Sequence, residues 1–221
     1  MGIKTWLGIA KKPKRKENRY DLRDRTDKFG DIRGGEALER LIAYDDITTV
    51  LDIGSGAGVH ADIMAKAGKS VTRLSLVEPA DVISDYLDYD APAQFDAIWA
   101  SHVLEHQPNV GQFLRKCFSD LRDGGVLAVT VPPLKHSIVG GHVALWNQGL
   151  LLYRLILAGF DCSTARVGGY DYDLSVIVRK VPADLPPDLY FNKDDIGKLA
   201  KFFPVPVRQG FDGRIPDTNW S

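Results

Sequence analysis

The most constraining stretch of this 221-residue chain is "VLDIGSGAGVH", from Val50 to His60. An apolar run typical of a buried strand leads directly into three glycines that alternate with small residues. Because glycine has no Cβ, the main chain of such a turn can approach a ligand closely and can adopt positive φ. Asp52 stands two positions before the first glycine. The stretch therefore predicts a strand, a tight turn and a helix against a bound molecule, with a carboxylate close by.

Apolar runs that predict strands alternate along the chain with segments of helical spacing. Strands are expected over 48–53, 70–77, 81–86, 95–101, 126–131, 160–169 and 173–180. Helices are expected over 35–44, 59–68, 147–159 and 109–125, the last of these stopped by Gly124–Gly125. The final two strands are expected to pair around a turn at Gly168–Gly169. This alternation predicts an α/β fold with a doubly wound, mostly parallel sheet, helices on both faces and an antiparallel last strand.

Composition divides the chain into three parts. Residues 1–30 form a basic and polar lead-in, residues 31–180 the α/β domain, and residues 181–221 an extension rich in proline and aromatic residues. The net charge of −1 argues against a domain that binds polyanions.

The lead-in carries a basic run at Lys11–Lys16, preceded by the apolar residues Trp6, Leu7 and Ile9. An apolar stub beside a basic cluster can dock weakly on anionic lipid. The sequence therefore raises a weak membrane-surface contact through residues 3–16, with a solvated tail as the alternative.

No apolar run is long enough to span a bilayer, and the first apolar stretch is too short for a signal peptide. The two cysteines, Cys117 and Cys162, lie in segments expected to be a core helix and a core strand. Buried thiols without export signals favour a reducing cytoplasm and no disulfide. The oligomeric state is left open.

The glycine turn distinguishes between two classes of cofactor site. A dinucleotide site requires the pattern G-x-G-x-x-G. Here the third glycine, Gly58, comes one position early, and Val59 occupies the position where the pattern requires glycine. The spacing Asp-x-Gly-x-Gly-x-Gly instead resembles motif I of the class I S-adenosylmethionine-dependent methyltransferases. The resemblance continues through "QFDAIWASHVLEHQPN", "LRDGGVLAVTVPP" and "LILAGFD", in the family's order. It implies a sheet of roughly seven strands and S-adenosylmethionine as the cofactor.

The same resemblance assigns residues to the two ends of the cofactor. Gly54, Ser55 and Gly56 would let the main chain approach the methionine end and the ribose, and Asp52 would face the ammonium group, directly or through water. The positive charge of the ammonium group would explain why a carboxylate stands so close to the turn.

Three further residues complete the expected cofactor site. Counting from the glycine turn places Ser75 where an acid normally binds the ribose, and the nearest carboxylate, Glu78, is the residue we expect in that role. Asp85 matches the acid that meets the adenine amino group, with a turn cap as the alternative. Ser101 is expected beside the methyl donor.

Histidines supply the candidate bases. "HVLEH", from His102 to His106, also fits the inverted zinc-peptidase pattern, but it follows a strand directly and precedes Pro108. A loop is therefore expected there, and no metal site. Histidine is the natural base for a hydroxyl acceptor, and we favour His142, then His106 and His102. The alternative is that each of them only caps or packs.

The sequence thus predicts a methyltransferase that acts on an oxygen of a glycan or small-molecule acceptor. A methyltransferase-like domain that binds without turnover is the alternative. A dinucleotide oxidoreductase is disfavoured by Val59. A nucleic-acid methyltransferase is disfavoured because "SHVLEH" stands where such enzymes carry "N-P-P-[YF]".

Overall fold

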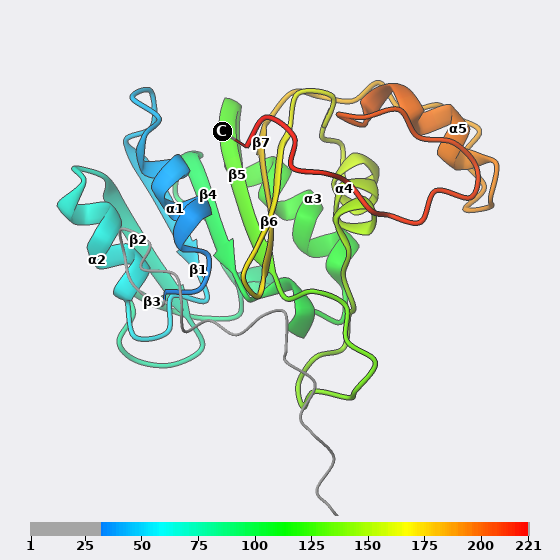
Figure 1. Ribbon diagram of the computed structural model, residues 1–221. Helices are drawn as coiled ribbons and strands as arrows, with labels where there is room; N and C mark the ends of the chain where they lie inside the picture. The colour runs from blue at the N-terminus through cyan, green and yellow to red at the C-terminus, as the bar shows by residue number, and fades with distance from the viewer. Residues whose placement is uncertain (1–31, 221) are drawn as a thin grey trace, which may run out of the picture.

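The computed structural model describes residues 32–220, which form a seven-stranded sheet flanked by helices (Figure 1). The spatial order of the strands is β3-β2-β1-β4-β5-β7-β6, with only β7 antiparallel to its neighbours. This arrangement confirms the predicted fold class. The strands are β1 (Thr49–Ile53), β2 (Ser70–Ser75), β3 (Val82–Ile83), β4 (Phe95–Ser101), β5 (Leu121–Val131), β6 (Arg166–Tyr170) and β7 (Asp173–Arg179). The helices are α1 (Gly35–Ile42), α2 (Val59–Lys66), α3 (Val110–Asp120), α4 (Gln148–Leu157) and α5 (Asp195–Leu199), with short 3₁₀ turns η2 (Tyr86–Asp88), η3 (Leu104–His106) and η4 (Ala200–Phe202).

The two faces of the sheet bury separate apolar clusters. Strand residues alternate between the faces, so that Val50 of β1 packs with α1 and α2, whereas Leu51 and Ile53 pack with α3 and α4. Figure 1 shows α1 and α2 on one side of the sheet and α3 and α4 on the other. Asp52 lies two residues after Val50, so it faces the same side of the sheet and is buried on the α1 and α2 side.

The strand order reverses between β1 and β4, which both run parallel to each other in the middle of the sheet. Beyond the carboxyl ends of these strands and of β5 lie the glycine turn 54–58, the loop 102–109 and a long loop over 132–147. In Figure 1 the loop 132–147 hangs below the sheet, while α5 lies at the opposite, upper end. Ligands of such sheets bind at this reversal, on the carboxyl side.

Two boundaries predicted from glycines were wrong, both because strand pairing overrode the glycine signal. The strands expected over 160–169 and 81–86 are also shorter, at Arg166–Tyr170 and Val82–Ile83. Helix α3 ends at Asp120, and β5 begins at Leu121, which pairs with Phe95 of β4. Gly124 and Gly125 therefore lie inside β5. A Cβ on Gly125 would stand 2.9 Å from the carbonyl oxygen of Asp96, so glycine is required by the close approach of β4.

The second correction concerns Gly168 and Gly169, which lie within β6 and pair with Ser175 and Leu174 of β7. The turn between the strands is formed by 171–172 instead. A Cβ on Gly168 would lie 2.3 Å from the indole of Trp220, so this glycine makes room for the C-terminal segment.

That segment packs back on the domain over much of its length. Phe202, Phe203 and Ile215 are buried in the α3 and α4 cluster. Trp220 stacks on Tyr170 with ring centroids 5.6 Å apart. Phe202, Phe203 and Trp220 of the extension are therefore packed on the domain, whereas Tyr190 and Phe191 are exposed. Among residues 32–220, no helix is both long and apolar enough to cross a membrane. The expected membrane contact of residues 3–16 lies outside the described residues.

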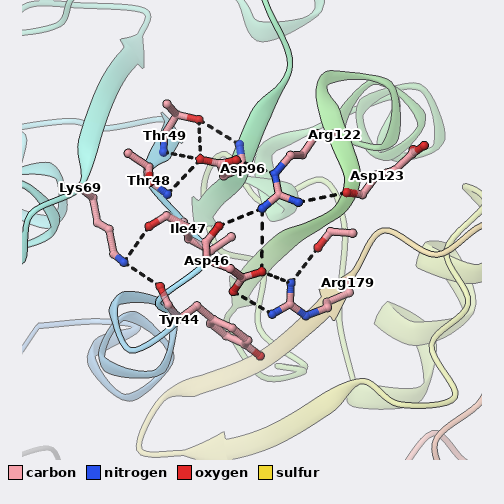
Figure 2. Close-up of polar contacts among 11 residues, drawn as sticks. Tyr44, Asp46, Ile47, Thr48, Thr49, Lys69, Asp96, Arg122, Asp123 and Arg179 are labelled. Carbon is pink, nitrogen blue, oxygen red and sulfur yellow. Dashed lines mark hydrogen bonds and ion pairs between the residues drawn. The ribbon is translucent and has the colours of Figure 1, made fainter.

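A polar network lies at the end of the sheet that is opposite the ligand side, where β1, β4 and β5 begin (Figure 2). The Asp96 carboxylate accepts hydrogen bonds from the main-chain N–H groups of Thr48 and Thr49, at 2.9 and 2.8 Å, and pairs with Arg122. Asp46 forms a two-point ion pair with Arg179, at 2.8 and 3.0 Å. The network joins β1, β4, β5 and β7 at this end of the sheet. The loops described above lie at the other end.

We expect Asp96→Ala to lower the free energy of unfolding by about 2 kcal/mol, because two main-chain donors and a guanidinium lose their acceptor. Burial raises the pKa of Asp96, but hydrogen bonds from Arg122, Thr49 and Thr48 outweigh burial and hold the pKa well below its ordinary value. The stabilisation is therefore present above about pH 4 and is lost as the pH falls further. Urea denaturation at pH 7 and pH 3 measures the difference. Asp123→Ala, at a carboxylate 94% exposed on the same edge, is the control and should change the stability by less than about 0.5 kcal/mol.

Candidate functional site

A cavity of about 250 Å³ opens at the carboxyl ends of β1, β2 and β4. It runs from the 3₁₀ turn η2 to the loop after β4. Its lining consists of Ile53, Gly54, Leu74, Ser75, Leu76, Ser84, Asp85, Tyr86, His102, Val103, His106 and Gln107. The lining brings together three predicted elements of the cofactor site, which are the glycine turn, the end of the second strand and Asp85, and two of the predicted bases, His102 and His106.

The glycine turn keeps side chains out of this cavity. Gly54 has φ 72°, and a Cβ there would stand 2.6 Å from Cγ2 of Val103 in the loop after β4. The N–H groups of Gly54 and Ser55 both donate to the carbonyl of Leu74, which holds the turn against β2. Gly58 caps α2 with φ 80°. Glycine at these positions is therefore required by the main chain, and Gly54 contributes main chain alone to the lining of the cavity.

Asp52 is buried beneath the turn, with 1% of its surface exposed. Its Oδ2 has no hydrogen-bond partner in the described part of the chain. Burial raises the pKa of Asp52 to about 7, although the positive charge of Arg73 works in the opposite direction. A buried carboxylate with an open oxygen is costly on its own and would be stabilised by a cation that enters from the cavity.

Unpartnered polar atoms gather around this edge of the sheet. Six buried side-chain nitrogen or oxygen atoms within residues 32–220 have no hydrogen-bond partner. Four of them belong to sequence neighbours of the residues that line this cavity, and a fifth lies in the loop 132–147. Such atoms are uncommon in folded proteins, and a bound ligand is a common reason for them. The five residues are Asp52, Ser55, Ser101, Glu105 and Trp146.

Asp85 and Leu76 form the far end of the cavity. Oδ1 of Asp85 accepts a hydrogen bond of 2.8 Å from the N–H of Leu87 and so caps η2, as the alternative interpretation expected. The same residue also lines the cavity, so capping and ligand contact are compatible. Leu76 is 69% exposed and presents a flat apolar surface there.

The residues expected around the ribose are placed differently. Ser75 ends β2, is buried and lines the cavity. Glu78 lies in the exposed loop between β2 and β3 and is not among the lining residues. This loop carries no helix over 76–81, in agreement with the short spacing in the sequence. The ribose-binding role of Glu78 stays a prediction.

His102 follows β4 directly and adopts φ 55°. Its Nε2 lies 2.8 Å from Oδ1 of Asp173, and its Nδ1 lies 3.1 Å from Oε1 of Glu105. Burial lowers the pKa of His102, but the hydrogen bonds to Asp173 and Glu105 outweigh burial and raise the pKa to about 9. His102 is therefore an imidazolium at neutral pH. It is suited to hold the loop 102–109 against β7 and poorly suited to accept a proton.

His106 and His142 meet at the other side of Glu105. Their rings lie edge to face with centroids 5.0 Å apart. Nδ1 of His106 lies 2.9 Å from the carbonyl oxygen of Gly141. The main chain of the loop 132–147 is fixed here as well, because Val143 and Ala144 both donate to the carbonyl of Glu105.

A second cavity of about 260 Å³ lies inside the loop 132–147. His142, Trp146, Lys135 and His136 line it, together with Tyr172 from the turn between β6 and β7. None of its lining residues is acidic. Tyr172 stands between two cations, with Arg33 at 4.3 Å and Lys135 at 4.2 Å from its ring centroid. The cavity is therefore apolar with a positively charged rim.

The structure thus brings together most of the predicted site residues. Gly54, Asp85, His102 and His106 line the first cavity, and His142 lines the second. Asp52, Ser55 and Ser101 lie directly beside lining residues, and Gly56 is an exposed part of the turn. Sequence reasoning missed Asp173, and it used Ser75 only to count the register. The role of Asp173 becomes visible only in the structure, because its partner His102 lies 71 positions earlier in the sequence.

The strand order, the cavity against the glycine turn and the open buried carboxylate indicate a Rossmann-like domain for a cofactor that carries a cationic group. Residues 14–157 match the family of methyltransferase domains. The chain belongs to this family, and the recognition of a class I S-adenosylmethionine-dependent methyltransferase is confirmed.

Several curated relatives share part of the domain. A ubiquinone biosynthesis O-methyltransferase of Pseudomonas fluorescens (strain Pf0-1) is 29% identical over 94 residues, which cover 34% of this chain and 40% of the relative. The corresponding enzyme of Pseudomonas paraeruginosa is 27% identical over 95 residues, covering 35% of this chain and 41% of the relative. The chain spans less than half the length of these curated relatives.

Solved structures share the fold at low sequence identity. A Burkholderia thailandensis 1,6-didemethyltoxoflavin-N1-methyltransferase, determined with its substrate and S-adenosylhomocysteine, has a TM-score of 0.57 and 22% identity, covering 66% of this chain and 76% of that protein. Human N-acetylserotonin methyltransferase, determined with S-adenosylmethionine, has a TM-score of 0.54 and 17% identity, covering 68% and 52%. Both structures carry the cofactor that the sequence predicts, or its demethylated product.

Proposed function

We propose that this protein transfers a methyl group from S-adenosylmethionine to an oxygen of a small-molecule acceptor. The observation that carries the proposal is the meeting of two cavities at one pair of histidines. His106 lines the cavity beneath the glycine turn, His142 lines the cavity inside the loop 132–147, and their ring centroids are 5.0 Å apart. A donor in the first cavity and an acceptor in the second would therefore face each other there.

The residues present fit the cofactor. Bound S-adenosylmethionine supplies a methyl group on a sulfonium, so the protein has to bind, align and exclude water. The open Oδ2 of Asp52 suits the ammonium group, directly or through water, and the exposed face of Leu76 suits the adenine ring. The main chain of Gly54 permits close approach between them.

The second cavity supports a small acceptor with a hydroxyl group. Trp146, Val139 and Leu145 supply apolar walls, and Lys135 supplies positive charge. Oxygen as the acceptor atom is supported by the relatives named O-methyltransferases. A glycan remains a wider alternative that the cavity does not favour. The two cysteines are buried and free, which agrees with the reducing cytoplasm that we propose as its location.

Among the three predicted bases, the geometry favours His142. His102 is held as a cation by two carboxylates, and His106 lines the donor cavity. His142 lies in the acceptor cavity itself. A base must reach the proton that it removes, and His142 is the candidate placed to do so.

We expect His142→Ala to lower the turnover number by about 100-fold without changing the affinity for S-adenosylmethionine, since a positioned base contributes at least that factor. The assay follows labelled methyl transfer to a panel of phenols and catechols, and calorimetry follows cofactor binding. Leu134→Ala, at a 53% exposed side chain of the same loop that does not line the cavity, is the control and should keep the turnover number within a few-fold. Unchanged turnover in His142→Ala would remove this residue as the base.

A domain that binds the cofactor without turnover is the second candidate. The observation in its favour is Ser75, which stands at the end of β2 where an acid is expected for the ribose. Cofactor binding with no labelled product from the acceptor panel or from a cell extract would favour this second candidate.

A further inference from the structure

We propose that Glu105, His106 and His142 form a binding site for a divalent transition-metal ion between the two cavities. One ligand atom from each of these side chains lies within 4.8 Å of the other two. The residues come from two separate loops, 102–109 and 132–147, which the fold brings together. The sequence pattern "HVLEH" had suggested a different set, with His102 and His106 as the pair, and no metal was expected.

His102 does not belong to the cluster, because both of its ring nitrogens are bound to carboxylates. The zinc-peptidase pattern also needs a regular helix to present both histidines on one face, and only the short turn η3 is formed here. The proposed site therefore shares residues with that pattern but has a different ligand set.

The hydrogen bonds of His106 leave the correct nitrogen for a metal ion. The carbonyl oxygen of Gly141 can only accept, so Nδ1 of His106 carries the proton and donates. Nε2 then holds the lone pair, and it lies 3.9 Å from Oε1 of Glu105. Histidine ligands of metal ions in proteins are commonly oriented by donating the other N–H to a carbonyl.

Glu105 provides an independent indication of a ligand. Its side chain is 1% exposed, and its Oε2 has no hydrogen-bond partner in the described chain. Its other oxygen accepts a hydrogen bond from His102, whose ring is in turn held by Asp173. A buried carboxylate with one oxygen oriented by a neighbour and the other open is the arrangement that a bound cation would satisfy.

The donor set indicates the class of ion. Two imidazole nitrogens and one carboxylate oxygen suit zinc and other first-row divalent metals better than magnesium or calcium, which prefer oxygen ligands throughout. Zinc–ligand bonds are about 2.0 to 2.2 Å, so the side chains have to close in by about an ångström around an ion. His106 has 46% of its side chain exposed and can rotate to do so. Three protein ligands leave one position open, as in catalytic zinc sites.

The role of the ion rests on the proposed function, whereas its binding does not. An acceptor hydroxyl at the open position would lose its proton to water more readily, because the ion lowers its pKa. The resulting oxygen would attack the methyl carbon, the carbon–sulfur bond would break, and its electron pair would remain on sulfur. In the metal-loaded protein His142 would therefore be a ligand of the ion and not the base. The ion would replace it by lowering the pKa of the acceptor hydroxyl.

The test is a calorimetric titration of the metal-free full chain with Zn²⁺, together with the absorption spectrum of the Co²⁺-loaded chain. We expect one ion per chain, visible d–d bands of Co²⁺, and a loss of affinity of at least about 100-fold in His106→Ala and in His142→Ala. Glu105→Gln should show the same loss, but the two histidine variants decide the question because they remove less buried side chains. His136→Ala, in the same loop but outside the cluster, should bind normally.

The proposal is overturned if the chain binds no stoichiometric ion, or if ion binding survives both His106→Ala and His142→Ala. It is also overturned if His136→Ala weakens binding as much as they do. Methyl transfer measured after treatment with a chelator separates the two proposals. Transfer at full rate by the metal-free chain would leave the proposed function intact and would remove the role of the ion.

Discussion

Asp52→Asn is expected to weaken the binding of S-adenosylmethionine by about 100-fold and, at the same time, to stabilise the protein without its cofactor. The first effect follows because the amide cannot neutralise an ammonium group, and a buried charge-assisted contact is worth about 2 to 3 kcal/mol. The second follows because the carboxylate is buried with an open oxygen. One substitution should therefore move affinity and stability in opposite directions.

The pH dependence gives the sign of the stability effect. Burial raises the pKa of Asp52 to about 7 in the folded protein. An unfolded aspartate titrates near 3.9, so the unfolded chain releases its proton first as the pH rises. The free energy of unfolding should therefore fall between about pH 4 and pH 7, by about 3 to 4 kcal/mol in the wild type. Asp52→Asn should lack this fall.

Calorimetry with the cofactor and urea denaturation at pH 4, 7 and 8 measure both effects. Asp62→Asn, at an exposed carboxylate in the first turn of α2, is the matched control and should change neither. Normal cofactor affinity in Asp52→Asn would show that the carboxylate does not face the ligand. A destabilised variant at pH 8 would contradict the account of an unsatisfied buried charge.

His102→Gln is expected to have the largest effect on stability, about 4 kcal/mol at pH 6, because it leaves Asp173 and Glu105 buried without their cation. Asp173 also accepts a hydrogen bond of 2.6 Å from the N–H of Gly34, so the loss should extend to the start of α1. His102 acts here as a positioning residue that joins β4, β7 and α1 beneath the site.

The pH profile distinguishes this role from simple packing. The pKa of His102 is raised to about 9 in the folded protein, despite burial, by its two carboxylate partners. The stabilisation is fully present below the unfolded pKa of about 6.5 and is lost as the pH rises through 9, by about 3 kcal/mol. Urea denaturation between pH 6 and pH 10 should show this fall in the wild type and in His60→Gln, the control, but not in His102→Gln. A parallel decline in His102→Gln would assign the pH dependence to another group.

The order of the elements was predictable because each signal was local. Apolar runs marked β1, β4 and β5, and the glycine turn marked the first crossover. The end of α3 was not predictable from its glycines, because the pairing of Leu121 with Phe95 is a contact between distant strands. The same limitation applies to Gly168, because its neighbour Trp220 lies far away in the sequence.

The site was predictable to the extent that its residues belong to the motif. Asp52, Gly54 and Asp85 were identified from the resemblance to the family's motifs, and Gly54 and Asp85 line the same cavity. The protonation of His102 was not predictable, because it depends on Asp173 in a strand that follows 71 positions later. Nor was the approach of His142 to His106, which depends on how the loop 132–147 folds back onto Glu105.

The central claim is that the cavity beneath the glycine turn seats the methyl donor with its reactive end toward His106 and His142. A crystal structure of the full chain grown with S-adenosylhomocysteine tests it most directly. The account predicts the amino group beside Asp52, the adenine near Leu76 and Asp85, and the sulfur directed at the two histidines. Density for the ligand elsewhere, or the same ligand with its sulfur directed away from that pair, would contradict it.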